Sequence, residues 1–293
     1  MAREDSPFKR LLSDFAANPT AVFGLILLGI IVVAALAAPL ISPQNPYDLA
    51  QLDVVSGRLP PGSTSDTGAT FWLGTDDQGR DMLSAIFYGL RISLAVGITS
   101  TVVALAIGLA LGLTAAYLGG RTETVIMRIA DIQLSFPAIL IALILLAVLG
   151  QGILKIILAL VTVQWAYYAR TVRSAALVEK RKEYVEAARC LALSPLRIVF
   201  RHILPNCLPP LIVVATVQVA AAIALEATLS FLGLGLPITE PSLGLLIANG
   251  YQYLLSGKYW ISFFPGVALL LTIVSINLVA DQLRDVLNPR FQQ

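Results

Sequence analysis

The sequence predicts an all-α polytopic membrane protein with six transmembrane helices. Hydrophobic residues make up 57% of the 293 positions, while charged residues make up only 13%. In a soluble domain about a quarter of all residues are usually charged, so this composition is typical of a protein that faces lipid. A helix needs about 20 apolar residues to cross the hydrocarbon core, and six stretches of the chain meet that requirement. Because unpaired backbone amides are not tolerated in lipid, we expect each stretch to be helical.

The six spans are placed by their apolar runs. The run at 92–117 contains no charged residue at all. The fourth run contains Lys155 near one end, where the lysine side chain can extend to the membrane interface. We expect the spans at about 21–41, 92–117, 132–150, 152–171, 209–229 and 259–280.

The first apolar run raises the alternative of a cleaved secretory signal peptide. Ala35-Leu36-Ala37 has the small residues that are typical of a cleavage site. However, the run from Ala21 to Ile41 is longer than the apolar core of a signal peptide, and the segment before it is long and of mixed charge. We therefore expect an uncleaved first transmembrane helix.

Positive charge is distributed unequally between the spans, and this bias predicts the orientation of the chain. If the N-terminus is cytoplasmic, five of the 20 Lys and Arg residues are external and the other fifteen are cytoplasmic. Segments 1–20 and 283–293 and the polar insert 173–208 are then cytoplasmic, whereas the loops 42–90 and 231–258 are external. The five external residues are Arg58, Arg80, Arg91, Lys155 and Lys258.

The composition also argues against several chemical functions. A net charge of +2 gives no electrostatic support for a nucleic-acid partner. Two cysteines, Cys190 and Cys207, do not form a disulfide framework, and the single histidine, His202, cannot build a histidine-based metal site. No cluster has the spacing of metal ligands, so we expect neither a metal nor another cofactor.

The insert between the fourth and fifth spans differs from its surroundings because it is charged and helical in pattern. Residues 177–191 are rich in Ala, Leu, Glu, Lys and Arg, which favour a helix. Ser194 before Pro195 is typical of a helix start, so we expect a second short helix from Pro195 to about His202, ended by Leu204-Pro205. Such a hairpin either docks in a groove of another protein or lies as a solvated amphipathic loop on the lipid.

Within the insert, Glu186-Ala187-Ala188 is followed by a small residue, Ala192, and later by Leu204-Pro205. This pattern resembles the EAA loop of ABC importer permeases, which implies a coupling hairpin seated in a cleft of a separate ATPase subunit. The family pattern prefers Gly where this chain has Ala192 and a branched apolar residue where it has His202. Alanine can adopt the left-handed turn at a cost of about 1 kcal/mol. The coupling residues implied by the resemblance are Glu186, Ala187, Ala188, Ala192, Ser194, Leu204 and Pro205.

Three further segments extend the resemblance over most of the chain. Residues 71–94, 225–237 and 281–290 resemble the dipeptide, oligopeptide and nickel branch of these permeases. The long loop after the first span resembles that of the C-type subunit in a heterodimeric permease pair. The resemblance implies a type I ABC importer permease fold with its core at 91–282.

The resemblance also implies the setting and partners of the protein. It implies a permease subunit that forms a pathway for peptides across the bacterial inner (plasma) membrane. The implied partners are a second homologous permease subunit, two cytoplasmic ABC ATPase subunits and a periplasmic or lipid-anchored substrate-binding protein. Nickel chelates, glutathione-like peptides and opines stay open as substrates beside dipeptides and longer peptides.

The energy source is expected on another chain. The sequence contains no Gly-x-x-x-x-Gly-Lys-Ser/Thr phosphate loop, and it therefore offers no visible means of holding ATP. We expect a non-catalytic membrane subunit, with ATP hydrolysis on its partners.

Three acids, Asp76, Asp77 and Asp81, crowd one stretch of the first external loop. They could bind a cation or a cationic partner. However, the segment from Thr75 to Gln78 also has the pattern of a capping box at the start of a helix, where acids are favourable. We favour the capping interpretation.

Two features inside the spans have both a functional and a structural interpretation. Glu226 lies near the outer end of the fifth span, where it either contacts substrate or a second permease subunit or simply extends to the interface. Gly108 and Gly112 have the spacing that lets helices approach closely, around a pathway, at a subunit interface or in ordinary helix packing. For the glycines alone we favour ordinary packing.

The alternative function is an ion-coupled secondary transporter or channel subunit. Such a protein would carry charged or broken helices near the bilayer midplane. The second, third and sixth spans carry no charge in their middle, which argues against ion coupling. A lipid-acting membrane enzyme is a third alternative, and only the Asp76–Asp81 stretch offers the acids that it would need.

Overall fold

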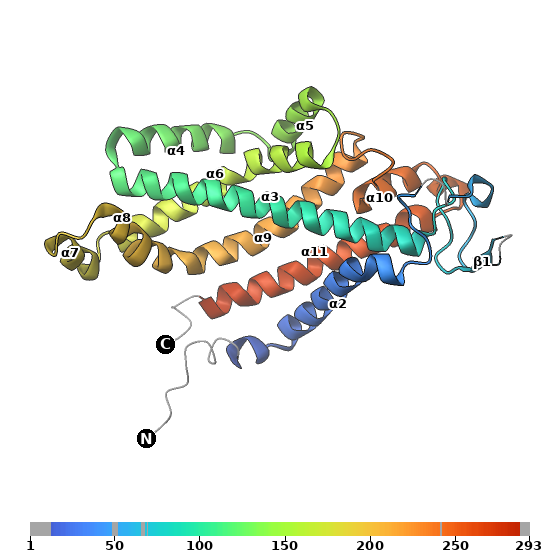
Figure 1. Cartoon of the computed structure of the whole chain (residues 1–293), viewed down its shortest axis with the longest axis horizontal. Helices are drawn as coiled ribbons and strands as arrows, with labels where there is room; N and C mark the ends of the chain where they lie inside the picture. Colours follow the sequence, from blue (N-terminus) through green and yellow to red (C-terminus); the bar gives the residue numbers. More distant parts are fainter. Residues whose placement is uncertain (1–12, 49–51, 66–67, 69, 241, 288–293) are drawn as a thin grey trace, which may run out of the picture.

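The protein is an elongated bundle of helices that run side by side (Figure 1). The computed structural model describes residues 13–48, 52–65, 68, 70–240 and 242–287. The predicted segments 1–20 and 283–293 therefore lie partly outside the described residues. The long helices are α2 (Pro19–Ile41), α3 (Met82–Leu118), α6 (Ile153–Glu179), α9 (Leu204–Phe231) and α11 (Trp260–Leu287).

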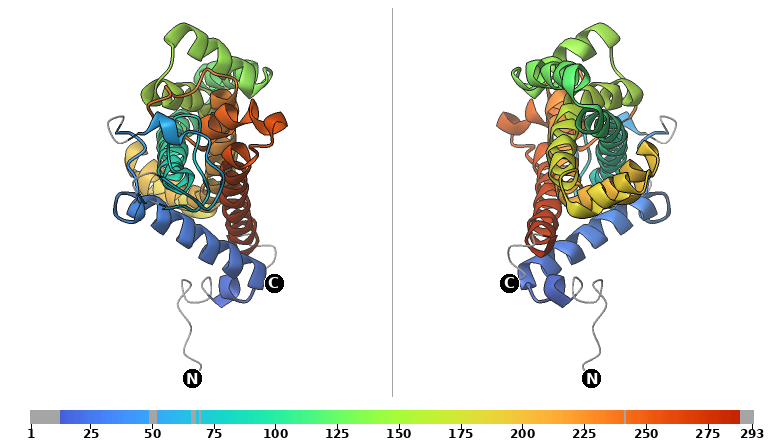
Figure 2. Two further views of the ribbon diagram at one scale, coloured as in Figure 1. Left: turned by 90° about the vertical axis from the view of Figure 1, so that its right-hand side faces the viewer. Right: turned by 90° about the vertical axis from the view of Figure 1, so that its left-hand side faces the viewer.

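Shorter elements form the two ends of the bundle, and the views in Figure 2 look along its length. The hairpin end carries α7 (Glu183–Cys190) and α8 (Pro195–Ile198). The opposite end, called the loop end, carries the described residues of the segment 42–81 and α10 (Leu243–Tyr251). Among the described residues of this segment, the two-residue strands β1 (Ser63–Thr64) and β2 (Thr70–Phe71) form an antiparallel pair.

The predicted fold class, an all-α polytopic membrane protein, is confirmed. Among the described residues, five helices are long and apolar enough to cross a membrane, and a bent pair of helices makes a sixth if it counts as one span. The outer face of α2 shows why such helices need lipid, because large apolar side chains such as Phe23, Ile30 and Leu36 are more than half exposed.

The third span differs from the prediction of one helix over 132–150. The chain instead forms α4 (Gly120–Leu134) and α5 (Ala138–Leu149), whose axes meet at 90°. Pro137 lies in the break, and a proline lacks the amide hydrogen that a helix needs and disfavours helical geometry in the residue before it. Ion pairs from Arg170 to Asp131 and from Arg173 to Glu123 hold α4 against α6.

Several helices also continue beyond the predicted apolar runs. α3 begins at Met82 rather than near 92, α6 ends at Glu179 rather than near 171, and α11 continues past 280 to Leu287. The extensions are less apolar than the spans, so hydropathy located the lipid-facing part of each helix rather than its ends. At the start of α3, the Asp81 carboxylate accepts a hydrogen bond from the backbone N–H of Ser84 at 2.8 Å and caps the helix.

The helices of the insert differ from the prediction in two ways. The predicted helix over 177–191 is interrupted, because α6 ends at Glu179 and α7 begins at Glu183. The second helix does not end at Leu204-Pro205 but widens into a π-helical turn at Val199–Ile203 and continues into α9. A wider turn accommodates the proline ring, which would clash with a carbonyl in a regular α-helix.

Close contact between α3 and α6 lies at the centre of the bundle. A Cβ atom added at Gly108 would lie 2.4 Å from the Cβ of Tyr168, and one added at Gly112 would lie 2.6 Å from the carbonyl oxygen of Ala169. The two glycines therefore let the backbones of these helices approach, as small residues do between membrane helices. This placement favours ordinary packing within the chain; a role at a pathway or a subunit interface stays a prediction.

A side chain at Gly108 should therefore loosen the bundle. We expect Gly108→Ala to lower the thermal unfolding midpoint of the detergent-solubilised protein, because the added methyl group forces apart two backbones at a cost of about 1–3 kcal/mol. The matched control is Gly29→Ala in α2, where an added Cβ would have no neighbour within 4 Å. Equal midpoints for the two variants would contradict the packing role of Gly108.

Candidate functional site

The hairpin at residues 180–206 has an inner side that packs on the bundle. Val185 and Ala188 of α7 are buried, as are Ile198 and Ile203, and they join a cluster with α3 and α6 side chains such as Tyr168. Burial of this apolar surface holds the hairpin in one position relative to the long helices. The hairpin is therefore an attached part of the bundle rather than a free loop.

Polar contacts clamp the base of the hairpin. The Lys180 ammonium donates to the carbonyl oxygens of Ala116 and Tyr117, each at 2.9 Å, and so neutralises the C-terminal end of α3. The Lys182 ammonium pairs with the Glu179 carboxylate at 2.9 Å. These contacts link the break after α6 to the last turn of α3.

Tyr184 joins both arms of the hairpin. Its hydroxyl donates to the Glu179 carboxylate and accepts a hydrogen bond from the side-chain amide of Asn206 at 3.0 Å. The same amide donates to the His202 carbonyl oxygen at 2.7 Å. Burial and the hydrogen bond to Glu179 raise the pKa of Tyr184 to about 12, so the hydroxyl keeps its proton at neutral pH.

The turn between the two arms is built on Ala192. Its φ angle is +53°, so this alanine adopts the left-handed conformation that was expected from the sequence. The backbone N–H of Leu193 donates to the Ala188 carbonyl oxygen at 3.2 Å, which closes the end of α7. Ser194 precedes Pro195 at the start of α8, but its side chain makes no capping hydrogen bond.

The outer side of the hairpin combines charged, small and large apolar side chains. Glu186 and Ala187 are exposed on α7, whereas Ala188 is buried, so the two adjacent alanines lie on different sides of the helix. Among the other predicted coupling residues, Leu204 packs partly on the buried cluster and Pro205 is exposed. The exposed apolar side chains, with their exposed fractions, are Leu191 at 74%, Leu196 at 70% and Phe200 at 60%.

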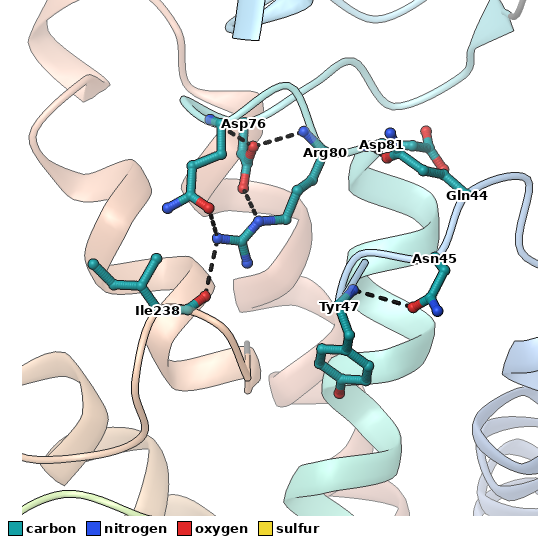
Figure 3. Close-up of polar contacts among 8 residues, drawn as sticks. Gln44, Asn45, Tyr47, Asp76, Arg80, Asp81 and Ile238 are labelled. Atoms are coloured by element: carbon teal, nitrogen blue, oxygen red, sulfur yellow. Dashed lines mark hydrogen bonds and ion pairs between the residues drawn. The ribbon is translucent and has the colours of Figure 1, made fainter. Parts of the chain in front are cut away.

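The acidic stretch at the loop end forms a buried ion pair rather than a capping box. The Asp76 carboxylate lies 3.3 Å from the Arg80 Nε atom and accepts hydrogen bonds from the backbone N–H groups of Gln78 and Arg80 (Figure 3). Arg80 also donates to the Ile238 carbonyl oxygen at 3.0 Å. Burial raises the pKa of Asp76 to about 6, although Arg80 lowers it. The capping prediction is correct for Asp81 and wrong for the Thr75–Gln78 segment.

A second set of hydrogen bonds ties this stretch to its neighbours. The Thr75 hydroxyl donates to the Ser56 carbonyl oxygen at 2.6 Å, and the Trp260 indole N–H donates to the Thr75 carbonyl oxygen at 3.1 Å. The segment therefore connects the first loop to the start of α11. Within the described part of the chain, no group of three or more His, Cys, Asp or Glu residues could hold a metal ion, so the cation interpretation gains no support.

Glu226 lies inside the chain and not at a lipid interface. Its side chain is fully buried and accepts hydrogen bonds from the hydroxyls of Ser93 at 3.1 Å and Ser230 at 2.8 Å. Ser242, which caps α10, lies 3.4 Å from the Ser230 hydroxyl. The carboxyl group therefore links α3, α9 and α10, and extension to the interface is not its role. Contact with a substrate or another subunit stays a prediction.

The sequence match decides the family. Residues 108–293 match the model described as binding-protein-dependent transport system inner membrane component. The chain belongs to this family. Residues 6–61 also match the model of the N-terminal transmembrane domain of oligopeptide transport permease C. The proteins of this family are permease components of ABC importers, and the alternative of an ion-coupled carrier or a membrane enzyme is not supported.

Relatives of this permease resemble it over nearly their whole length. The di/tripeptide transport system permease protein DppC of Pseudomonas aeruginosa is 38% identical over 98% of this chain and 93% of its own. The oligopeptide transport system permease protein OppC of Bacillus subtilis is 36% identical over 98% of this chain and 91% of its own. These similarities confirm the resemblance to the dipeptide and oligopeptide branch.

A solved structure supports the fold. A permease chain in the inward-facing MetNI methionine ABC transporter matches with a TM-score of 0.59 at 22% identity, over 71% of this chain and 98% of that chain. The type I ABC importer permease fold expected from the sequence is confirmed.

The left-handed turn at Ala192 gives a test of the hairpin geometry. We expect Ala192→Gly to keep full transport activity, because glycine adopts this conformation without steric cost. Ala192→Val should reduce ATP-driven transport at least about tenfold, because a β-branched residue strongly disfavours a positive φ angle. Uptake by the reconstituted transporter measures both, and equal activity of the two variants would contradict the importance of this turn.

Proposed function

We propose that this permease is one of two homologous subunits that together form the pathway of a peptide importer. The assignment of the substrate is supported by the relatives, which are named as permeases for dipeptides, tripeptides and oligopeptides. The remaining proposed partners are two ABC ATPase subunits and a substrate-binding protein, because the family is described as binding-protein-dependent.

The proposed orientation places the hairpin end in the cytoplasm of a bacterium and the loop end outside the inner membrane. It is supported by the excess of Lys and Arg in the segments at the hairpin end. The Asn18 side-chain amide donates to the side chain of Gln282 at 2.7 Å, so the start of α2 and the last part of α11 lie at the same end of the bundle. Both termini are then cytoplasmic.

The exposed outer side of the hairpin is the observation that carries the proposal. Leu191, Leu196 and Phe200 are exposed, as are the acid Glu186 and the small Ala187, on a segment whose inner side packs on the bundle. Large apolar side chains exposed on a polar hairpin between two spans are typical of a surface for another protein. We propose that a partner ATPase binds it, with Glu186, Ala187 and the Ala192 turn at the contact and with Ala188 supporting it from within.

The hairpin can transmit movement because both of its arms continue into long helices. One arm follows α6 after the short break at residues 180–182, and the other becomes α9 through the π-helical turn without a loop. On this proposal, closure of the ATPase subunits on ATP moves the hairpin, and α6 and α9 move with it. The permease itself then forms no covalent intermediate and supplies no acid or base.

A groove of about 900 Å³ between α6, α9 and α11 is a candidate wall of the pathway. It opens in the half of the bundle near the hairpin and mixes apolar side chains with the polar side chains of Thr171, Asn206 and Gln218. A surface of mixed polarity suits the passage of peptides, which combine a polar backbone with varied side chains. Movement of the hairpin would change the shape of this groove, because α6 and α9 line it.

The hairpin surface can be tested by changing exposed residues. We expect Glu186→Lys and Ala187→Asp each to lower ATP-driven peptide uptake into proteoliposomes at least about tenfold. The first variant reverses a charge at the ATPase contact, and the second adds a negative charge there. The matched control is Asp285→Lys, which changes an exposed charge near the same end of the bundle but outside the hairpin. If uptake with the hairpin variants equals uptake with the control, the coupling role is refuted.

Cys190 offers a direct test of the same contact. It is an exposed free thiol at the end of α7. We expect a short bifunctional thiol reagent to link Cys190 to an ATPase subunit with an engineered cysteine in its cleft, and the yield to fall in Cys190→Ser. In the assembled transporter, cross-links that reach only lipid or the second permease would count against the docking of the hairpin on the ATPase.

A further inference from the structure

A cavity of about 520 Å³ opens at the loop end beside α3. Its apolar lining comes from α3 and from the start of α6, and its polar lining consists of Tyr47, Arg91, Thr239 and Glu240. An apolar hollow of a few hundred Å³ with a few convergent polar groups is typical of sites for small ligands. The polar groups come from three separate segments of the chain, which the fold brings together.

The two charged residues of the cavity have opposite signs. Arg91 is exposed on α3, and Glu240 is half-buried in the segment before α10. Among the ion pairs of the described residues, none involves Arg91 or Glu240. One cavity therefore presents a free guanidinium and a free carboxylate to whatever enters it.

Tyr47 supplies a third polar group to the same cavity. Its hydroxyl donates to the Tyr88 carbonyl oxygen at 3.4 Å, and its ring packs edge-on against the Tyr88 ring with the two ring centroids 4.9 Å apart. Burial raises the pKa of Tyr47, the Glu240 carboxylate raises it further, and the Arg91 guanidinium lowers it. Both charges therefore act on the same hydroxyl, whose oxygen can still accept a hydrogen bond from a ligand.

The polar walls of the cavity are held in place by the loop-end network. The hydrogen bond from Arg80 to the Ile238 carbonyl oxygen fixes the segment that carries Thr239 and Glu240. The side chain of Gln44 accepts a hydrogen bond from the backbone N–H of Asp81 at 2.7 Å, which fixes the segment that carries Tyr47. A site with walls held in this way is largely formed before a ligand arrives.

We infer that this cavity is a subsite for a small zwitterion, namely a short peptide whose carboxylate lies on Arg91 and whose ammonium group lies on Glu240. A guanidinium binds a carboxylate through two parallel hydrogen bonds, and a carboxylate accepts hydrogen bonds from an ammonium group, so a cavity lined by both can hold the two charged ends of a short peptide. A ligand with a single charge would leave either Arg91 or Glu240 without a partner, so the arrangement selects for a ligand with both charges. The inference rests on the proposed function and adds a first contact point for the peptide at the loop end.

The test uses a thiol placed in the cavity of the whole transporter. Ala95 lines the cavity and is exposed, so Ala95→Cys in a Cys190→Ser background gives a reactive reporter. The complex is held in nanodiscs of phosphatidylglycerol and labelled with a charged methanethiosulfonate reagent. We expect alanyl-alanine to slow the labelling at least threefold, and N-acetyl-alanyl-alanine amide, which lacks both charges, to leave the rate unchanged.

Variants of the two charges complete the test. Arg91→Gln and Glu240→Gln should each abolish the protection by alanyl-alanine, whereas Lys258→Gln, which removes a loop-end cation outside the cavity, should keep it. Equal protection by the neutral analogue, or protection that survives in both variants, would overturn the inference. Protection by phosphatidylethanolamine in the nanodisc without any peptide would also overturn it, because the zwitterion would then be a lipid headgroup.

The test separates this inference from the proposed function. ATP-driven uptake of peptide by the wild-type transporter, together with unchanged labelling in the presence of alanyl-alanine, would refute the subsite and leave the importer role intact. Absence of uptake with any peptide would refute the proposed substrate class, and the subsite inference would fall with it.

Discussion

The close contact between α3 and α6 is the constraint on which the rest of the structure depends. Lipid supplies no hydrophobic force that drives helices together, so membrane helices rely on contact at short range, which Gly108 and Gly112 allow. α6 leads into the hairpin, and Lys180 at its end binds the last turn of α3. We therefore expect the two helices to move as one body between the hairpin end and the loop end, so that a displacement at one end is carried to the other.

The hairpin shows how one short segment can be both attached and available. Residues at α-helical spacing divide α7 into an inner side with Val185 and Ala188 and an outer side with Glu186 and Ala187. Small side chains serve different purposes on the two sides, because Ala188 allows close contact with the bundle while Ala187 leaves a flat outer surface. The left-handed alanine at 192 turns the chain so that the large apolar side chains after it remain exposed.

Hydropathy and the EAA-like spacing predicted the membrane fold, the positions of most spans and the place of the hairpin. They missed features that depend on backbone geometry or on contacts between distant segments. The bend at Pro137 was hidden inside an apolar run, although the proline itself was a usable signal. Asp76 and Arg80 are only four residues apart in the sequence, but Arg80 also binds the carbonyl oxygen of Ile238, and Trp260 binds the neighbouring Thr75. No local sequence pattern links these distant residues to the pair.

The buried ion pair at the loop end is best understood through what it positions. Moving two charges from water into the protein interior costs a free energy that can exceed the electrostatic attraction between them. A buried ion pair is therefore weak evidence for a gain in stability. Here Arg80 also holds the carbonyl oxygen of Ile238, and the next two residues form one wall of the cavity beside Arg91. A pair that can satisfy its charges in only one arrangement restricts a long irregular loop to that arrangement. The buried pair thus fixes the position of the Glu240 carboxylate. An apolar contact, which has no preferred direction, would not fix that position as narrowly.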